Sequence, residues 1–245
     1  MSNKILSGSQ PHETGLDRPL YTPIKRRSFF MYAGATAGAT ALVLAGCKDD
    51  NNSNSPSTVN VGTADVGVLN YAYALEQLEA GFYTSLRTGT YYTGLGPNSA
   101  EKLILDDLYY HEVIHRDFFR TAITNAGATP IKALTPDFSK IDFSSRTSVL
   151  GAAKAFEDLG VAAYNGAARF ITQPGYLFIA GKIVSVEARH AAIIRDLVTE
   201  GSFVGSDIVD IAGNSLEMSK LPSVVVATAN TFLADGSKLD VSGLG

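Results

Sequence analysis

Residues 112–115, Glu-Val-Ile-His, and residues 187–190, Glu-Ala-Arg-His, give this chain two Glu-x-x-His pairs. Residues three apart on an α-helix lie about 60° apart around its axis, so each pair directs a carboxylate and an imidazole to the same side. An arginine follows each glutamate after eight residues, as Arg120 and Arg195, and both arginines are expected at the surface. The two segments therefore have the pattern of two copies of one helix.

A second repeated segment precedes each pair. ALEQLEAGFY covers residues 74–83 and AFEDLGVAAY covers residues 155–164. Their alignment matches two glutamates and two tyrosines, Glu76 with Glu157 and Tyr83 with Tyr164. The chain is thus a tandem repeat of a helix with one glutamate followed by a helix with Glu-x-x-His. Together the four helices supply four carboxylates and two imidazoles, the ligand set of di-iron and di-manganese carboxylate sites in four-helix bundles.

Start and stop signals in residues 63–201 support this division. Asp65 is the expected cap of the first helix, and Asn98 with Glu101 forms a candidate capping box for the second. About twenty residues without periodicity separate the second helix from the third, whereas the other connections are short. Short, long, short is the connection order of a bundle with one long crossover. The four helices are expected at about residues 65–87, 98–125, 147–171 and 175–200.

Residues 202–245 form a C-terminal extension that is expected to pack on the bundle. A fifth, short helix is expected from Leu221 to Leu233, because Pro222 is a favourable first residue of a helix. The tail after this helix contains glycine and serine and is expected to be loosely ordered.

The first 47 residues have the features of an export signal. Lys25-Arg26-Arg27-Ser28-Phe29-Phe30 resembles a twin-arginine signal, and the uncharged run that follows ends in Leu44-Ala45-Gly46-Cys47, which resembles a lipobox. Cys47 is the chain's one cysteine, so a disulfide framework and thiolate metal ligands are excluded. We expect Cys47 to carry a lipid and the polar residues 48–62 to form a flexible tether. The alternative is a transmembrane helix, since about 18 residues is the lower limit for spanning.

Removal of this leader changes the net charge of the chain. The whole chain has 20 basic and 24 acidic residues, and residues 1–47 hold five and two of them, which leaves a net charge of −7. An acidic domain without a basic stripe is a poor partner for nucleic acid. The sequence thus predicts an exported lipoprotein of the cell envelope, periplasmic or on the outer surface, that contacts the membrane through its lipid.

Three segments, LNYAYALEQLEAGFY, YYHEVIHRDFFRTAITNAGATP and IVSVEARHAAIIRDL, resemble the exported ferritin-like domain family that includes desiccation-related proteins. The resemblance covers about residues 64–235. It implies an all-α, ferritin-like four-helix bundle with two bound metal ions, iron or manganese. It places the metal ligands on Glu76, Glu112, His115, Glu157, Glu187 and His190. One departure is Glu79, a second acid on the first helix, where the third helix has Gly160.

Four further residues are expected beside the ligands: Glu79, Tyr83, His111 and Tyr164. Glu79 is expected at the surface or next to the ligands. The tyrosines either fill the core or support the ligating carboxylates by hydrogen bonds. Other roles are open for the ligands themselves, since the glutamates of the first and third helices could pair with the two arginines, and the histidines could be core residues satisfied by hydrogen bonds.

His111-Glu112-Val113-Ile114-His115 also matches the HExxH motif of zinc metalloproteases. In that interpretation both histidines bind zinc and Glu112 is the general base. Residues 116–135 contain no further His or Glu as a third ligand, and the second Glu-x-x-His pair stays unexplained. The zinc protease is therefore the remote alternative.

Carboxylate and imidazole ligands without thiolate suit iron or manganese. The family resemblance allows ferrous oxidation, peroxide removal or catalase-like dismutation, so the expected function is an oxidoreductase acting on ferrous iron, O2 or peroxide in stress defence. The opposing hypothesis is a non-catalytic, desiccation-related envelope lipoprotein with a structural role. The sequence does not separate these two.

Overall fold

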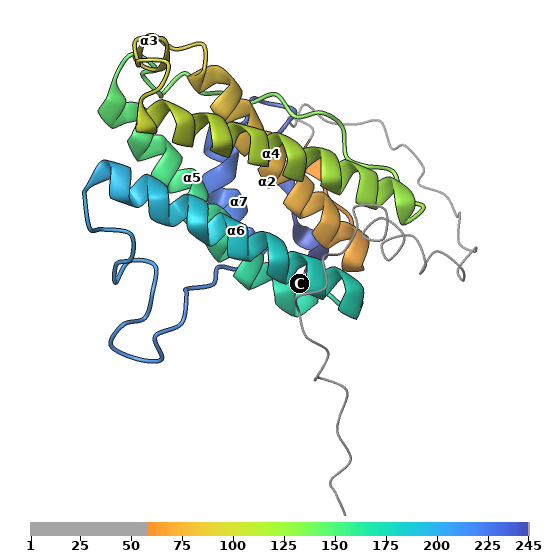
Figure 1. The fold of residues 1–245 in the computed structure, drawn as a ribbon. Helices are drawn as coiled ribbons and strands as arrows, with labels where there is room; N and C mark the ends of the chain where they lie inside the picture. Colours follow the sequence, from red (N-terminus) through yellow and green to blue (C-terminus); the bar gives the residue numbers. More distant parts are fainter. Residues whose placement is uncertain (1–57, 245) are drawn as a thin grey trace, which may run out of the picture.

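A computed structural model describes residues 58–244 of the chain. The twin-arginine segment, Cys47 and the tether as far as residue 57 lie outside the described residues. Within the described part, four long helices form a bundle in which α2 packs mainly on α4, and α5 mainly on α6 (Figure 1). These helices are α2 (Ala64–Leu86), α4 (Ala100–Asn125), α5 (Arg146–Ala167) and α6 (Pro174–Val198). The prediction of an all-α four-helix bundle is confirmed.

α2 is the central helix of the fold, because most of its residues are buried. Phe82 of α2 packs edge-on against Phe138 of the crossover and in a tilted arrangement against Phe156 of α5. Each fully buried aromatic side chain of this kind contributes about 1.5–3 kcal/mol through the area it removes from water. The apolar core therefore joins both helix pairs and the crossover.

The crossover between α4 and α5 runs along the bundle beside α2 (Figure 1). Two α2 side chains hold it: the amide oxygen of Asn70 accepts from Ile131 N at 3.0 Å, and that of Gln77 accepts from Leu134 N at 2.8 Å. Asn70 and Gln77 lie two turns apart on α2, so successive residues of the crossover are fixed along its length. The long loop required by the connection order is thus ordered by hydrogen bonds to the helix it follows.

The C-terminal extension returns to the bundle. Its helix α7 (Pro222–Ala229) contacts α5 and α2 and continues into the 3-10 helix η2 (Asn230–Phe232). Strand β2 (Leu239–Asp240) then pairs in parallel with β1 (Val59–Asn60), and the 3-10 helix η3 (Ser242–Leu244) contacts α2. The expectation of a loosely ordered tail is wrong, since apolar side chains of this segment are buried: Leu239, Val241 and Leu244.

Two predicted helix caps are also wrong. The N-cap of α2 is Thr63, and the Asp65 carboxylate instead accepts hydrogen bonds from Thr172 and from the backbone N of Gln173, in the connection before α6. The N-cap of α4 is Ser99, whose Oγ accepts from Lys102 N. Glu101 is then free to pair with Arg146 of α5 at 2.9 Å. Both acidic side chains thus connect segments that are distant in the sequence, and these contacts replace the predicted capping hydrogen bonds.

The connection between α2 and α4 contains a one-turn helix, α3 (Thr90–Thr93), that the sequence did not indicate. Among residues 58–244, no helix combines the length and the apolar composition needed to cross a membrane.

Candidate metal centre

The six predicted ligands meet in the middle of the bundle. α2 supplies Glu76, α5 supplies Glu157, and α4 and α6 each supply one Glu-x-x-His pair. The four glutamates are fully buried at 0% exposure, and His190 is 4% exposed. An isolated carboxylate is rarely tolerated at such burial, because the charged form loses its hydration. The repeat therefore brings four carboxylates, each of which is unfavourable to bury, into one small volume.

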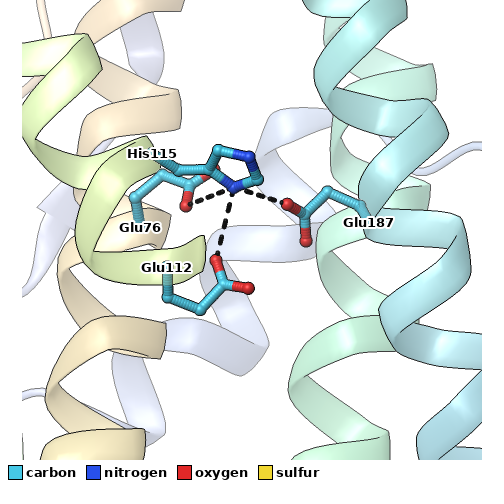
Figure 2. A group of neighbouring side chains, drawn as sticks. All are labelled: Glu76, Glu112, His115 and Glu187. Atoms are coloured by element: carbon cyan, nitrogen blue, oxygen red, sulfur yellow. Dashed lines mark ion pairs between the residues drawn. The ribbon is translucent and has the colours of Figure 1, made fainter. Parts of the chain in front are cut away.

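Within residues 58–244, two groups of these residues have the spacing to hold a metal ion, with donor atoms within 4.8 Å of one another. The first group surrounds Nδ1 of His115, which lies 2.8 Å from Glu187 Oε1 and 3.5 Å from both Glu76 Oε2 and Glu112 Oε2 (Figure 2). Figure 2 shows the carboxylates of α2, α4 and α6 pointing toward the same imidazole nitrogen.

The second group surrounds Nδ1 of His190. This atom lies 2.7 Å from Glu112 Oε1, 3.5 Å from Glu157 Oε2 and 3.7 Å from Glu187 Oε2. Glu112 and Glu187 belong to both groups, each presenting a different oxygen to each histidine. They therefore lie between the two groups, whereas Glu76 belongs only to the first group and Glu157 only to the second.

The donor atoms lack the hydrogen bonds that buried polar atoms normally make. Eight donor atoms of the two groups have no hydrogen-bond partner of normal geometry in the described part of the chain: Glu76 Oε2, Glu157 Oε2, both carboxylate oxygens of Glu112 and of Glu187, and Nδ1 of His115 and His190. Donor atoms that lie this close together without hydrogen bonds have the arrangement expected around a bound cation. The residues thus fit the two ions that the resemblance implies.

The charge of the two groups also fits the binding of metal ions. The two groups contain four carboxylates, so their total charge of −4 equals that of two divalent ions with opposite sign. Oxygen and imidazole donors suit iron and manganese, which also change oxidation state. A buried charge cluster without such ions would be strongly destabilising. The geometry, the donor atoms without hydrogen bonds and the charge therefore all fit the binding of metal ions.

A comparison with protein-family models agrees with this geometry: the model of the ferritin-like domain matches residues 64–200. The chain belongs to the ferritin-like domain family. The match begins at the first residue of α2 and ends just after α6, so it covers the whole ferritin-like bundle. The comparison with curated proteins finds no matching relative.

Two tyrosines support the carboxylates of the ferritin-like centre in a crossed arrangement. Tyr83 of α2 donates to Glu157 Oε1 of α5, and Tyr164 of α5 donates to Glu76 Oε1 of α2. Burial, followed by the neighbouring carboxylate, raises the pKa of both phenols above its ordinary value, so the hydroxyl groups keep their protons and donate. Each bond fixes one oxygen of a carboxylate and leaves the other directed at a histidine.

His111 lies at the surface of α4 and contacts the second group from outside. Its Nδ1 lies 2.8 Å from Nε2 of His190, on the side of that ring opposite the carboxylates. Burial, and then the neighbouring His190, lowers the pKa of His111, which favours the neutral form as an acceptor. His190 then carries its proton on Nε2 and presents an unprotonated Nδ1 to a metal.

The position of His111 also bears on the interpretation of HExxH as a zinc site. Neither metal-binding group in residues 58–244 contains His111, whereas both contain Glu112 as a donor. Glu112 is fully buried between the two groups, so it is not placed as a general base beside a solvent-accessible water. The geometry therefore favours the two-ion centre over the single zinc.

Glu79 is a fifth buried carboxylate at the centre, at 4% exposure, so of its two expected positions it takes the one next to the ligands and not the one at the surface. A Cβ atom at position 160 would lie only 2.9 Å from Glu79 Oε1 and 3.9 Å from Glu187 Oε2. Gly160 thus provides the space for the second acid of α2. Burial, and then the charge of Glu112, raises the pKa of Glu79 well above its ordinary value.

The two repeated arginines have different surroundings. Arg120 is exposed and pairs with Asp117. Arg195 is 3% exposed and is bound by Asp158 at 2.8 Å and by Asp207 of the C-terminal extension at 2.5 Å, so its predicted exposure is wrong. In neither case does an arginine pair with the glutamates of the centre. The arginine that is buried owes its position to the extension, which the repeat does not include.

We expect Glu76→Gln to lose about one metal ion per chain and Glu79→Gln to keep about two, because Glu76 belongs to one of the metal groups and Glu79 to neither. Both changes preserve side-chain volume, so each is the control for the other. Metal analysis after loading with Fe(II) or Mn(II) measures the difference. Equal losses would show that the repeat alignment does not define the ligands.

We also expect metal binding to strengthen as the pH rises. In the metal-free centre, burial lowers the pKa of His115, but contacts with Glu112, Glu187 and Glu76 outweigh it and raise the pKa to about 12. The histidine therefore keeps a proton at neutral pH that a metal must displace, which gives about a tenfold gain in affinity per pH unit for each proton released. Titrations with Mn(II) at several pH values, with proton release followed by an indicator, test this. An affinity independent of pH would contradict the protonated centre.

Proposed function

We propose that this chain is a dinuclear iron or manganese carboxylate protein of the cell envelope and an oxidoreductase that acts on ferrous iron, O2 or peroxide in stress defence. The observation that carries the proposal is the convergence, around His115 and His190 in a buried, ferritin-like bundle, of eight donor atoms without hydrogen bonds in the described part of the chain. Structural ion pairs normally have hydrogen-bond geometry, whereas the close histidine–carboxylate contacts of this centre do not.

In this proposal, Glu76 and His115 hold one ion, Glu157 and His190 hold the other, and Glu112 and Glu187 bind both. When bound, the two ions supply electron transfer to or from O2 or peroxide. The protein's own contribution is positional. The two tyrosine hydroxyls fix the outer carboxylates, and His111 fixes the ring of His190. The apolar helices around them exclude bulk water from the charges.

The decisive measurement is the metal content of protein purified from its natural compartment, followed by assays of O2 and peroxide consumption. About two iron or manganese ions per chain with turnover are expected. Bound metal without turnover under either oxidant would favour the non-catalytic envelope protein. The absence of iron and manganese from folded protein would contradict the dinuclear centre itself.

The envelope location has a separate test at Cys47, which lies outside the described residues. Cys47→Ser is expected to move the exported full-length protein from the membrane fraction to the soluble fraction, because the lipid would have no attachment point. Fractionation and immunoblotting measure the distribution, with Ser53→Ala in the tether as the control. Retention of the Cys47→Ser protein in the membrane fraction would indicate a transmembrane anchor.

A further inference from the structure

An apolar cavity of about 40 Å³ lies in the half of the bundle that contains the start of α2 and α6 and the end of α4 and α5. All four helices contribute to it, and these helix ends lie together at one end of the bundle (Figure 1). Its walls include the following side chains: Leu69, Ala72, Phe119, Ala122, Ile179 and Ala180. A single water needs about 10–15 Å³ of such space, so the cavity has room for a small molecule.

The cavity reaches the metal centre through Tyr164. This residue lines the cavity, and its hydroxyl donates to Glu76. Leu75, the neighbour of Glu76 on α2, is also part of the wall. Within residues 58–244, none of the predicted ligands lines the cavity. A molecule in the cavity would therefore contact a side chain that is hydrogen-bonded to one of the predicted ligands, Glu76.

The polar groups of the lining offer little to a bound water. The carboxylate of Asp65 is already used by Thr172 and Gln173, and the hydroxyl of Tyr164 is used by Glu76. Tyr176 and Tyr71 also belong to the lining, and the Tyr71 hydroxyl has no hydrogen-bond partner in the described part of the chain, but the surface that faces the cavity is almost entirely apolar. A buried water requires two to four partners, whereas cavities with apolar walls stay dry and take up non-polar molecules such as xenon.

We propose that this cavity is a binding site for small non-polar molecules and that it holds O2 beside the metal centre. The O2 assignment rests on the proposed function and restricts the oxidant of that function to O2. Of the two oxidants considered, O2 is non-polar and suits this site, whereas hydrogen peroxide carries two hydroxyl groups that the walls would leave without partners. The cavity therefore selects O2 as the oxidant supplied from this end of the bundle.

The first test uses crystals of the protein under xenon pressure. Xenon is expected in the cavity of the wild type and of Ala188→Leu, but not of Ala180→Leu. Ala180 lines the cavity, whereas Ala188 is exposed on the same helix. Ala122→Leu fills the cavity from α4 and replaces Ala180→Leu if that variant does not fold. Absence of xenon from the wild type, or its presence in both filled variants, would overturn the binding site.

The second test measures O2 and peroxide consumption by the Fe(II)-loaded variants at equal iron content. Ala180→Leu is expected to slow O2 consumption several-fold relative to Ala188→Leu and to leave peroxide consumption unchanged. Equal O2 rates in the two variants would overturn the O2 assignment even if xenon binds. No O2 consumption by the iron-loaded wild type would contradict both the oxidase activity and the O2 assignment, while the xenon experiment still decides whether the cavity binds non-polar molecules.

Discussion

Glu187→Ala is expected to leave fewer than about one metal ion per chain, because Glu187 belongs to both candidate metal groups. His190→Ala removes a donor from one group and is expected to leave about one ion. His111→Ala is expected to leave about two, since neither group within residues 58–244 includes His111. Metal analysis of the folded variants after loading with Fe(II) or Mn(II) measures this series, with the exposed Glu200→Ala as the control.

The order within this series separates the two metal hypotheses. A zinc site built on HExxH needs His111 and is indifferent to Glu187, which lies on another helix. A single zinc ion that is lost in His111→Ala and retained in Glu187→Ala would therefore overturn the dinuclear centre, although the ferritin-like bundle would stand. A modest loss of affinity in His111→Ala is compatible with the centre, because this residue orients His190 by a hydrogen bond.

The sequence predicted which six residues meet inside the bundle, because these residues follow helical geometry and an internal repeat. Glu112 and His115 share a face at a separation of three residues, and the second repeat places Glu187 and His190 in the same way. The repeat also predicted that Tyr83 and Tyr164 have equivalent roles. It did not reveal that each tyrosine binds the glutamate of the other repeat, because that pairing depends on how the two helix pairs face each other.

Other features depended on contacts that a helical pattern does not encode. Arg195 is buried because Asp207 of the extension covers it, and Asp65 binds a connection more than one hundred residues away in the sequence. Glu79 shows a missed signal within the repeat itself. Its partner in the alignment is Gly160, and an acid opposite the smallest residue indicates that only one of the two positions has space for a side chain.

Removal of the metals is expected to have the largest effect on stability. With free metal at about a hundred times the dissociation constant, each site adds about 2.7 kcal/mol to the free energy of unfolding, so two sites add about 5 kcal/mol. For a domain of this size, the loss corresponds to a fall in melting temperature of about 10–20 °C. Thermal unfolding with and without a chelator measures it. The same chelator should have a smaller effect on Glu187→Ala, which is expected to hold less than about one ion per chain before the chelator is added.

The metal-free domain is further expected to lose stability as the pH rises above about 6.5. The raised pKa of His115, about 12, means that above the ordinary histidine pKa the folded chain keeps a proton that the unfolded chain releases. The unfolded state then binds fewer protons, and the free energy of unfolding falls by up to about 1.4 kcal/mol per pH unit for such a histidine.

The buried carboxyl groups with raised pKa values act in the same direction above their ordinary pKa. Burial, and then the charge of Glu187, raises the pKa of Glu112, and burial raises that of Glu157, so ionisation of either group at higher pH destabilises the folded state. Burial alone would also raise the pKa of Glu187, but its contacts with the two histidines lower it to about 2, so its stabilising effect is lost only in acid. Metal binding displaces these protons, so the affinity for metal rises with pH. The stability difference between loaded and metal-free protein should therefore widen from pH 6 to pH 8 in urea unfolding, and a metal-free midpoint that rises over this range would contradict a protonated, crowded centre.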